Sequence, residues 1–147
     1  IGLIASAFPE AKIIHVKRDS SATCWGIYKK CFSLEADSLA FGYSLDDIVR
    51  YYKLYIKLIR FFRDSLSHDI YELDYESLVV NMEIETKNLI HYLNLHWEES
   101  CLSPHKNSRE VMTSSKFQVR KKIYKGSSKD WQKFQPFLNG ILDNLDK

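Results

Sequence analysis

The sequence predicts a single α/β domain in which parallel strands are joined by helical crossovers. Three patterns support this prediction: a short run of β-branched residues at 11–16, a long amphipathic helical pattern after residue 44, and an alternating stretch at 70–75. Strands separated by so long a connection pair in parallel, because a short hairpin turn cannot join them. The 147 residues, 45% of them hydrophobic, are enough for one core, so we expect one domain over residues 1–147.

The first predicted strand is Ala11–Val16 (AKIIHV), an apolar run typical of a buried strand. Arg18 follows closely, at the carboxyl end of the strand, where open α/β sheets collect their ligands. Asp19 and the two serines after it are candidates for the N-cap of a helix. Apolar side chains at helical spacing predict the helix itself; they are Ala22, Trp25, Tyr28 and Phe32.

A loop is expected at 33–43, and a helix of about 22 residues after it. Ser44 and Asp47 form a capping box at the start of that helix. Its apolar stripe is typical of a core-facing helix and consists of Ile48, Tyr52, Tyr55, Ile59, Phe62 and Leu66.

The alternating stretch Ile70–Tyr75 predicts the second strand. Asn81 is expected to cap a third helix, which Asn94 ends in a left-handed conformation. Residues 98–129 are polar and basic, a stretch too long to be an idle connection in a compact domain. The apolar spacing from Trp131 to Leu145 predicts a final amphipathic helix that docks on the body of the domain.

Charge is concentrated in one segment, although the whole chain carries only +2. Between Lys106 and Lys133 there are nine Lys or Arg residues, against the two acids Glu110 and Asp130. A basic segment on an otherwise acidic chain suggests an anionic ligand rather than long nucleic acid. A solvated charged face is an equally good interpretation of this pattern alone.

Several classes of protein are disfavoured by the sequence. No apolar run approaches the roughly 20 residues of a membrane span. Neither the three cysteines nor the five histidines have the spacing of a metal site, and the cysteines lack a CxxC pair. The motif G-x-x-x-x-G-K-[ST] of nucleotide triphosphatases is also missing. We therefore expect reduced thiols, no metal, no membrane span and a cytoplasmic protein.

Two groups of residues carry recognisable chemistry. Arg18 offers a planar bidentate fork beside a predicted helix N-terminus, which is a way to bind phosphate without a glycine-rich loop. A surface pair with Asp19 is the alternative for this arginine. The second group combines hydroxyls, cations and one glycine, as a phosphate-cradling loop does, but such strings occur in many loops. Its members are Ser115, Gln118, Arg120, Lys121, Lys122, Tyr124, Lys125, Gly126, Ser127 and Ser128.

From end to end, the chain resembles sulfotransferases of the group that includes tetratricopeptide-linked and tyrosylprotein sulfotransferases. The matching strings are IGLIASAFPEAKIIHVKRD, SATCW, LDDIVRYYKLYIKLIRF, YELDYESLV, SPHKN, QVRKKIYKGSS and the terminal W-x-x-F-x-P-F-L. They correspond to the C-terminal part of a family domain. The resemblance therefore implies a P-loop-like sulfotransferase fold that is N-terminally incomplete in these residues.

The resemblance also implies a ligand, the sulfate donor 3′-phosphoadenylyl sulfate (PAPS), which leaves as adenosine 3′,5′-bisphosphate (PAP). Arg18 matches an arginine that grips the 3′-phosphate, and Gly26 stands where relatives have a serine for the same phosphate. Lys30 matches a further basic residue of the tyrosylprotein branch. Tyr75 matches a tyrosine of the adenine pocket, for which a core tyrosine at a strand end is the alternative.

The closing part of the site is implied by the same resemblance. Ser115 matches the serine before Gln-Val, and Lys125 with Gly126 matches the K-G string of the cytosolic branch. Tyr124 stands where that branch has an arginine, so one phosphate cation is missing by comparison. The glycine at position 26 removes a hydroxyl contact typically worth about 0.5–1.5 kcal/mol.

Two functions follow from the resemblance. In the first, a complete protein transfers a sulfuryl group from PAPS to a hydroxyl or amine acceptor, and this part binds the 3′-phosphate and adenine. The acceptor is a carbohydrate, a protein tyrosine or a small molecule. In the alternative, the chain is a non-catalytic remnant that binds a nucleotide or a partner. The phosphosulfate loop and catalytic base of relatives have no counterpart before Arg18, so we name no catalytic residue and expect residues 1–147 to be inactive alone.

Overall fold

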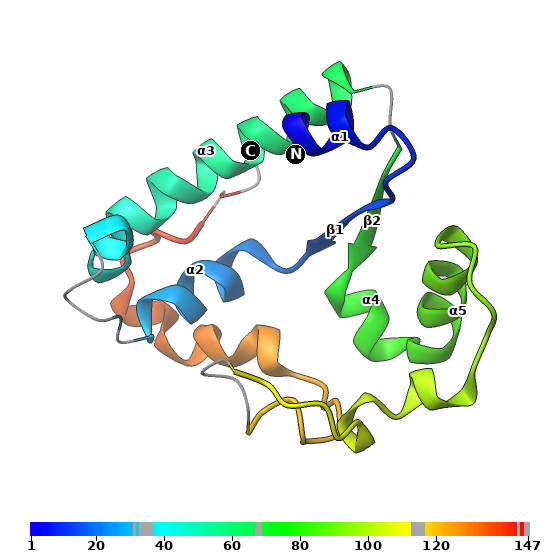
Figure 1. The fold of residues 1–147 in the computed structure, drawn as a ribbon. Coiled ribbons are helices and arrows are strands. Elements are labelled where there is room, and N and C mark those ends of the chain that lie inside the picture. Colours follow the sequence, from blue (N-terminus) through cyan, green and yellow to red (C-terminus); the bar gives the residue numbers. More distant parts are fainter. Residues whose placement is uncertain (31, 33–36, 67–68, 113–116, 144, 146–147) are drawn as a thin grey trace.

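The computed structural model describes residues 1–30, 32, 37–66, 69–112, 117–143 and 145. Helices surround a small sheet, with the long helix α3 on one side and α4 and α5 on the other (Figure 1). The elements, with 3-10 helices written η, are α1 (Gly2–Ala7), β1 (Ile13–Lys17), α2 (Ser20–Tyr28), η1 (Asp37–Tyr43), α3 (Leu45–Ser65), β2 (Ile70–Asp74), α4 (Tyr75–Val80), α5 (Met82–Tyr92), η2 (Glu99–Leu102), η3 (Pro104–Lys106) and η4 (Ser127–Phe137).

The sheet consists of β1 and β2, which pair in parallel in the register Ile13 with Ile70 through Lys17 with Asp74. This pairing confirms the predicted α/β class with a helical crossover. The strand boundaries differ slightly from the prediction. β1 starts at Ile13 rather than at Ala11, and Tyr75 opens α4 instead of closing the second strand. In both strands the carboxyl ends point toward the same edge of the sheet, so the segments that follow them lie together.

The turn after β1 is fixed by the N-cap of α2. Asp19 is the N-cap residue, and its Oδ1 accepts the N–H of Ala22 at 2.7 Å. The helix ends at Tyr28, so Phe32 lies outside it, contrary to the predicted spacing. Gly26 lies in the last turn, and its low helix propensity favours an early end.

Helix α3 agrees closely with the prediction. It spans 21 residues from Leu45, and the Ser44 Oγ accepts the N–H of Asp47 at 3.4 Å. Two aspartates in its first turn stabilise the helix, because their negative charge lies near the positive end of the helix dipole. Ile48, Tyr52 and Ile59 are buried on its inner face, while η1 occupies part of the segment that was expected to be a loop.

Two short helices, α1 and α4, were not predicted. α4 follows β2 directly because Asp74 acts as its N-cap, its Oδ1 accepting the N–H of Ser77 at 2.7 Å. α5 begins after Asn81, as predicted, although the Asn81 side chain makes no capping bond. Asn94 has a φ of 58°, which confirms the predicted left-handed end.

The C-terminal segment is not the predicted amphipathic α-helix. Residues 127–137 form η4, and Asn139 and Gly140 then turn the chain with φ values of 47° and 72°. Pro136 lacks the N–H that an α-helix needs and disfavours helical geometry in the preceding residue. The predicted docking is nevertheless confirmed, since Leu142 and Leu145 are buried and the Ser21 Oγ donates to the carbonyl of Leu142 at 3.0 Å.

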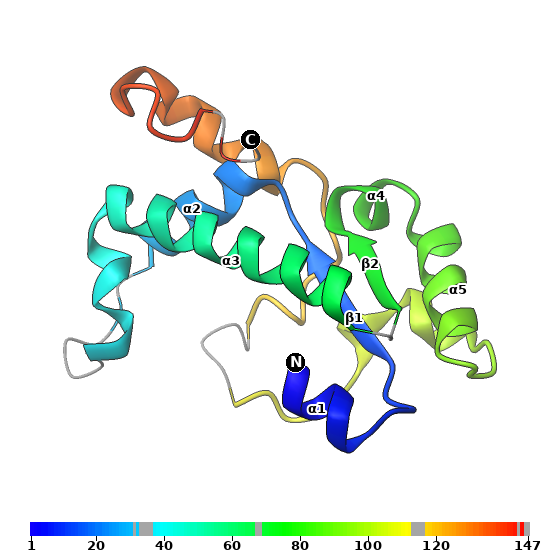
Figure 2. The ribbon, with the colours of Figure 1, turned by 90° about the horizontal axis from the view of Figure 1, so that it is seen from above.

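The hydrophobic core lies where α2, α3 and the C-terminal segment meet, away from the sheet (Figure 2). Its buried members are Cys24, Trp25, Ile48, Tyr52, Leu142 and Leu145. Among the helices of the described ranges, none has both the length and the apolar character that a bilayer crossing requires.

Candidate functional site

Arg18 lies immediately after β1 and contacts two segments that are distant in sequence. Its Nε donates to the Oγ of Ser128 at 3.3 Å, and its Nη2 donates to the carbonyl of Ser127 at 3.3 Å. The guanidinium carbon also lies 5.2 Å from the ring centroid of Tyr75, a cation–π distance. Residues from the first strand end, the second strand end and the C-terminal segment therefore meet at one guanidinium group.

Glu76 connects the same three segments by hydrogen bonds. One of its carboxylate oxygens accepts from the Oγ of Ser128, and the other accepts the N–H of Asp19 at 3.1 Å. The hydroxyl groups of Tyr75 and Ser127 lie 3.3 Å apart. The side chains after β2 thus connect the turn after β1 to the first residues of η4.

These bonds alter one expectation about the N-terminus of α2. The helix N-terminus was expected to help bind a phosphate, but the N–H groups of Asp19 and Ala22 are bonded to carboxylates, those of Glu76 and Asp19. These two N–H groups therefore already have hydrogen-bond partners, whereas the Arg18 guanidinium is the cation at this turn. The alternative interpretation, a surface pair between Arg18 and Asp19, is not among the ion pairs of the described residues.

Gly126 is the N-cap residue of η4 and has a φ of 101°. Residues with a side chain rarely adopt this left-handed conformation, so a glycine is required where the chain turns into Ser127 and Ser128. The N–H of Lys129 closes the turn on the carbonyl of Gly126 at 2.9 Å. The serine pair is held against Arg18 by this turn.

The structure brings only some of the predicted site residues together. Arg18, Tyr75 and Gly126 belong to one cluster, and Gly26 and Lys30 line a cavity that also touches Arg18. Tyr124 and Lys125 are exposed; Tyr124 has 63% of its residue surface accessible. Ser115 lies outside the described residues.

The cavity lies between α2 and α3 and has a volume of about 610 Å³. Gly26 forms part of its wall, and a methyl group built there would meet no atom within 4 Å. The Cβ of a residue with a side chain would therefore meet open space at this position. Arg18 contributes to the wall of the cavity and to the Tyr75 cluster, so the two are adjacent.

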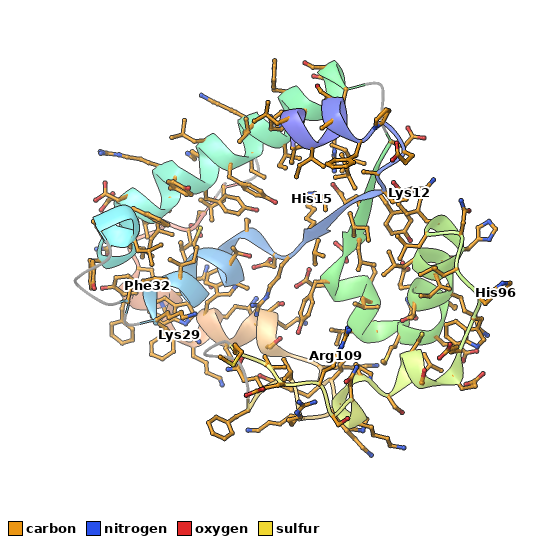
Figure 3. All side chains as sticks on the ribbon, in the orientation of Figure 1. Lys12, His15, Lys29, Phe32, His96 and Arg109 are labelled. Atoms are coloured by element: carbon orange, nitrogen blue, oxygen red, sulfur yellow. The ribbon has the colours of Figure 1, made fainter. Side chains whose placement is uncertain are left out.

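His15 extends from β1 toward α3 (Figure 3). Its Nε2 is hydrogen-bonded to the hydroxyl of Tyr55, which also lines the cavity, and its Nδ1 lies 3.6 Å from a carboxylate oxygen of Glu72. Burial, and then the positive charges of Arg63 and Lys17, lower the pKa of His15. Burial raises the pKa of Tyr55. Both side chains are therefore held in their neutral forms near pH 7.

The sequence placed Ser127 and Ser128 in the candidate phosphate-cradling group but indicated no role for Glu76, which directly follows Tyr75. What the sequence cannot indicate is that Ser128 bridges Arg18 and Glu76 across separations of 110 and 52 residues. Within the described ranges, His, Cys, Asp and Glu side chains form no group of three that could hold a metal ion.

Comparison with known proteins places the chain in a family. The profile described as "Sulfotransferase family" matches residues 1–99, more than half of the chain. An uncharacterized protein of Aquifex aeolicus (strain VF5) is 30% identical over 147 residues, which are 100% of this chain and 19% of that protein. The chain thus spans about a fifth of the length of this relative. Because the family profile covers more than half of its residues, the chain belongs to the sulfotransferase family.

Proposed function

We propose that this chain is the donor-binding portion of a sulfotransferase, and that it binds the 3′-phosphate and adenine of PAPS. The observation that carries the proposal is that Tyr75, Ser127 and Ser128 all contact the guanidinium group of Arg18. Members of this family generally take their sulfuryl group from PAPS. The complete protein would transfer that group to a hydroxyl or amine acceptor.

The chemistry of the cluster suits a phosphorylated purine nucleotide. Two of the five N–H groups of Arg18 bond to Ser127 and Ser128, and a guanidinium can bind a phosphate in a bidentate manner with its other donors. The Tyr75 ring offers a flat π-face for adenine, and stacking on an aromatic ring is worth about 1–3 kcal/mol per base. Lys30 adds positive charge on the cavity side of Arg18.

The turn at Gly126 would position the hydroxyls of Ser127 and Ser128; it would not supply further cations. Ser128 is oriented by Glu76, and Ser127 by Tyr75, so neither hydroxyl must be ordered when the nucleotide arrives. The family resemblance adds Ser115, Tyr124 and Lys125 to the proposed contact set. Sulfuryl transfer also needs a base for the acceptor proton and donors for the 5′-phosphosulfate, and we assign neither role to a residue of this chain.

The proposal is tested by titrating the full-length protein with PAP in a calorimeter. We expect saturable binding that Arg18→Ala weakens strongly, and sulfuryl transfer from PAPS by the full-length protein. Residues 1–147 alone should show no transfer to phenols, sugars or tyrosyl peptides. Binding of PAP without any transfer by the full-length protein would favour the alternative of a non-catalytic nucleotide-binding protein. Undiminished PAP affinity in the Arg18→Ala variant would remove this arginine from the site.

A further inference from the structure

We infer that Tyr55 is a further phosphate-binding residue of the donor cavity, and that His15 is the positioning residue that directs its hydroxyl group. This inference rests on the proposed function, because it adds a hydrogen-bond donor to the same nucleotide site. The sequence indicates no binding role for either residue, since Tyr55 belongs to the apolar stripe of α3 and His15 lies within the first strand.

Tyr55 belongs both to the cavity wall and to a polar network that extends to the sheet. It lines the cavity together with the cations Arg18 and Lys30, and none of the described residues of that wall is Asp or Glu. The Tyr55 hydroxyl is hydrogen-bonded to the Nε2 of His15, which comes from β1. His15 is not among the described residues that line the cavity. Tyr55 is therefore the group through which His15 can act on a ligand.

An ionic cluster lies on the other side of the His15 ring. The Nδ1 atom is 3.6 Å from a carboxylate oxygen of Glu72, and the His15 side chain is only 12% exposed. Glu72 is paired with Arg63 of α3 and lies 3.9 Å from the ammonium group of Lys17. Nδ1 is buried and makes no hydrogen bond to the described residues. The charged group nearest to this nitrogen is thus a carboxylate, which favours a hydrogen on Nδ1.

The Tyr55 hydroxyl has one hydrogen, and the form of His15 decides where it points. When Nε2 is unprotonated, it accepts that hydrogen, and the Tyr55 oxygen offers only lone pairs to the cavity. When both ring nitrogens carry a hydrogen, Nδ1 faces Glu72 and Nε2 donates to the Tyr55 oxygen. The Tyr55 O–H is then released to donate elsewhere. Phosphate oxygens accept hydrogen bonds, so this second arrangement is the one that binds the nucleotide.

A bound phosphate would favour the protonated form of His15. In the free chain, burial and then the charges of Arg63 and Lys17 lower the pKa of His15. A phosphate beside Tyr55 adds negative charge, which raises the same pKa. PAP binding should therefore take up protons at His15. By reciprocity, PAP affinity should rise as the pH falls through the pKa of the complex, with no further gain below the pKa of the free chain.

The first test removes only the hydroxyl group of Tyr55 in the full-length protein. Tyr55→Phe should lower PAP affinity about tenfold in calorimetric titration, because one hydrogen bond to a charged group is lost. Adenosine, which has no phosphate, should bind as it does to the native protein. Tyr28→Phe is the matched control: it removes a hydroxyl from a ring of α2 that is 44% exposed and does not line the cavity. It should change neither affinity.

The second test separates positioning from packing at His15. The amide group of His15→Gln can still donate a hydrogen bond to Tyr55, whereas His15→Leu cannot. We expect PAP affinity to stay within about twofold of native in His15→Gln and to fall about fivefold or more in His15→Leu. An equal loss in both variants would show that the ring acts through packing and would overturn its positioning role.

The third test counts protons. Titrations with PAP in two buffers of different ionisation enthalpy, at the same pH, give the number of protons taken up on binding. The native protein should take up more than His15→Gln; protons from PAP itself cancel in this difference. His96→Gln, at an exposed position, should behave as the native protein does. Equal uptake by the native protein and His15→Gln would overturn the role given to His15.

Failure of this inference can be distinguished from failure of the proposed function. If the native protein binds PAP and Tyr55→Phe binds it equally well, Tyr55 does not contact the phosphate, while the donor function survives. If the native protein does not bind PAP at all, the proposed function itself is wrong.

Discussion

The two halves of the candidate nucleotide site are built in different ways. Arg18 and Tyr75 directly follow two paired strands, and each strand leads into a helix with an aspartate N-cap. Ser127 and Ser128 follow a long segment in which the described residues 107–112 and 117–126 form neither helix nor strand. The strand-end half is therefore positioned by backbone pairing, whereas the loop half is held mainly by its contacts with Arg18, Tyr75 and Glu76.

This difference suggests that the two halves have different roles in binding. The strand-end half would supply the cation and the aromatic face in a fixed geometry. The loop half would supply the serine hydroxyls, which Arg18, Tyr75 and Glu76 hold in place. Substitutions in the two halves should thus affect different quantities, and the following predictions test this.

The largest effect is expected for Arg18→Ala. Hydrogen bonds to charged groups contribute about 1.5–3 kcal/mol each, so PAP affinity should fall on the order of 100-fold. Arg50→Ala serves as the control, because the Arg50 side chain is 80% exposed on α3 and should leave PAP affinity unchanged. Calorimetric titration measures both variants. A similar loss in both would indicate a general charge effect instead of a specific contact.

The second prediction compares the same substitution at two glycines. Gly126→Ala should lower the free energy of unfolding by about 1–3 kcal/mol and weaken PAP binding, because an alanine is strained at a φ of 101°. Gly26→Ala, within α2 and with open space around it, should raise that free energy by about 0.5–1 kcal/mol. Urea denaturation distinguishes the two. Destabilisation of equal size in both variants would contradict the role given to the Gly126 turn.

A smaller gain is expected for Gly26→Ser. The Cβ that this substitution adds meets open space in a cavity that Arg18 also lines, and the new hydroxyl would restore a phosphate contact worth about 0.5–1.5 kcal/mol. PAP should therefore bind about two- to tenfold more tightly, while adenosine, which has no phosphate, should bind as before. A gain for both ligands would show that the serine acts through the fold and not through the phosphate.

The smallest effect concerns pH and lies outside the nucleotide site. The pKa of His15 is lowered in the folded chain, chiefly by burial, so the unfolded chain binds more protons as the pH falls through the ordinary value of 6.5. Stability should decrease in that range until the lower folded-state pKa is reached. His15→Leu should flatten this dependence in urea denaturation at several pH values, whereas His96→Gln, at an exposed position, should retain it. An unchanged profile in His15→Leu would exclude His15 as its source.

Much of the strand-end half could be predicted from the sequence, and little of the loop half. The strand before Arg18 and the capping box at Ser44 follow from local rules, because apolar runs and N-caps act within a few residues. The prediction of a C-terminal α-helix was wrong because it followed the apolar spacing alone. Pro136 and Gly140 disfavour an α-helix in this segment. The bridge from Arg18 through Ser128 to Glu76 joins residues that only the tertiary fold brings together, and no local pattern indicates it.

The central claim is that Arg18 binds the 3′-phosphate of the donor nucleotide. The most direct test measures the affinities of PAP and adenosine 5′-monophosphate, which lacks that phosphate, for the full-length protein and its Arg18→Ala variant. We predict that the native protein prefers PAP strongly and that the variant binds both nucleotides about equally, because removal of either partner abolishes the same contact. An Arg18→Ala variant that keeps the full preference for PAP would contradict the account.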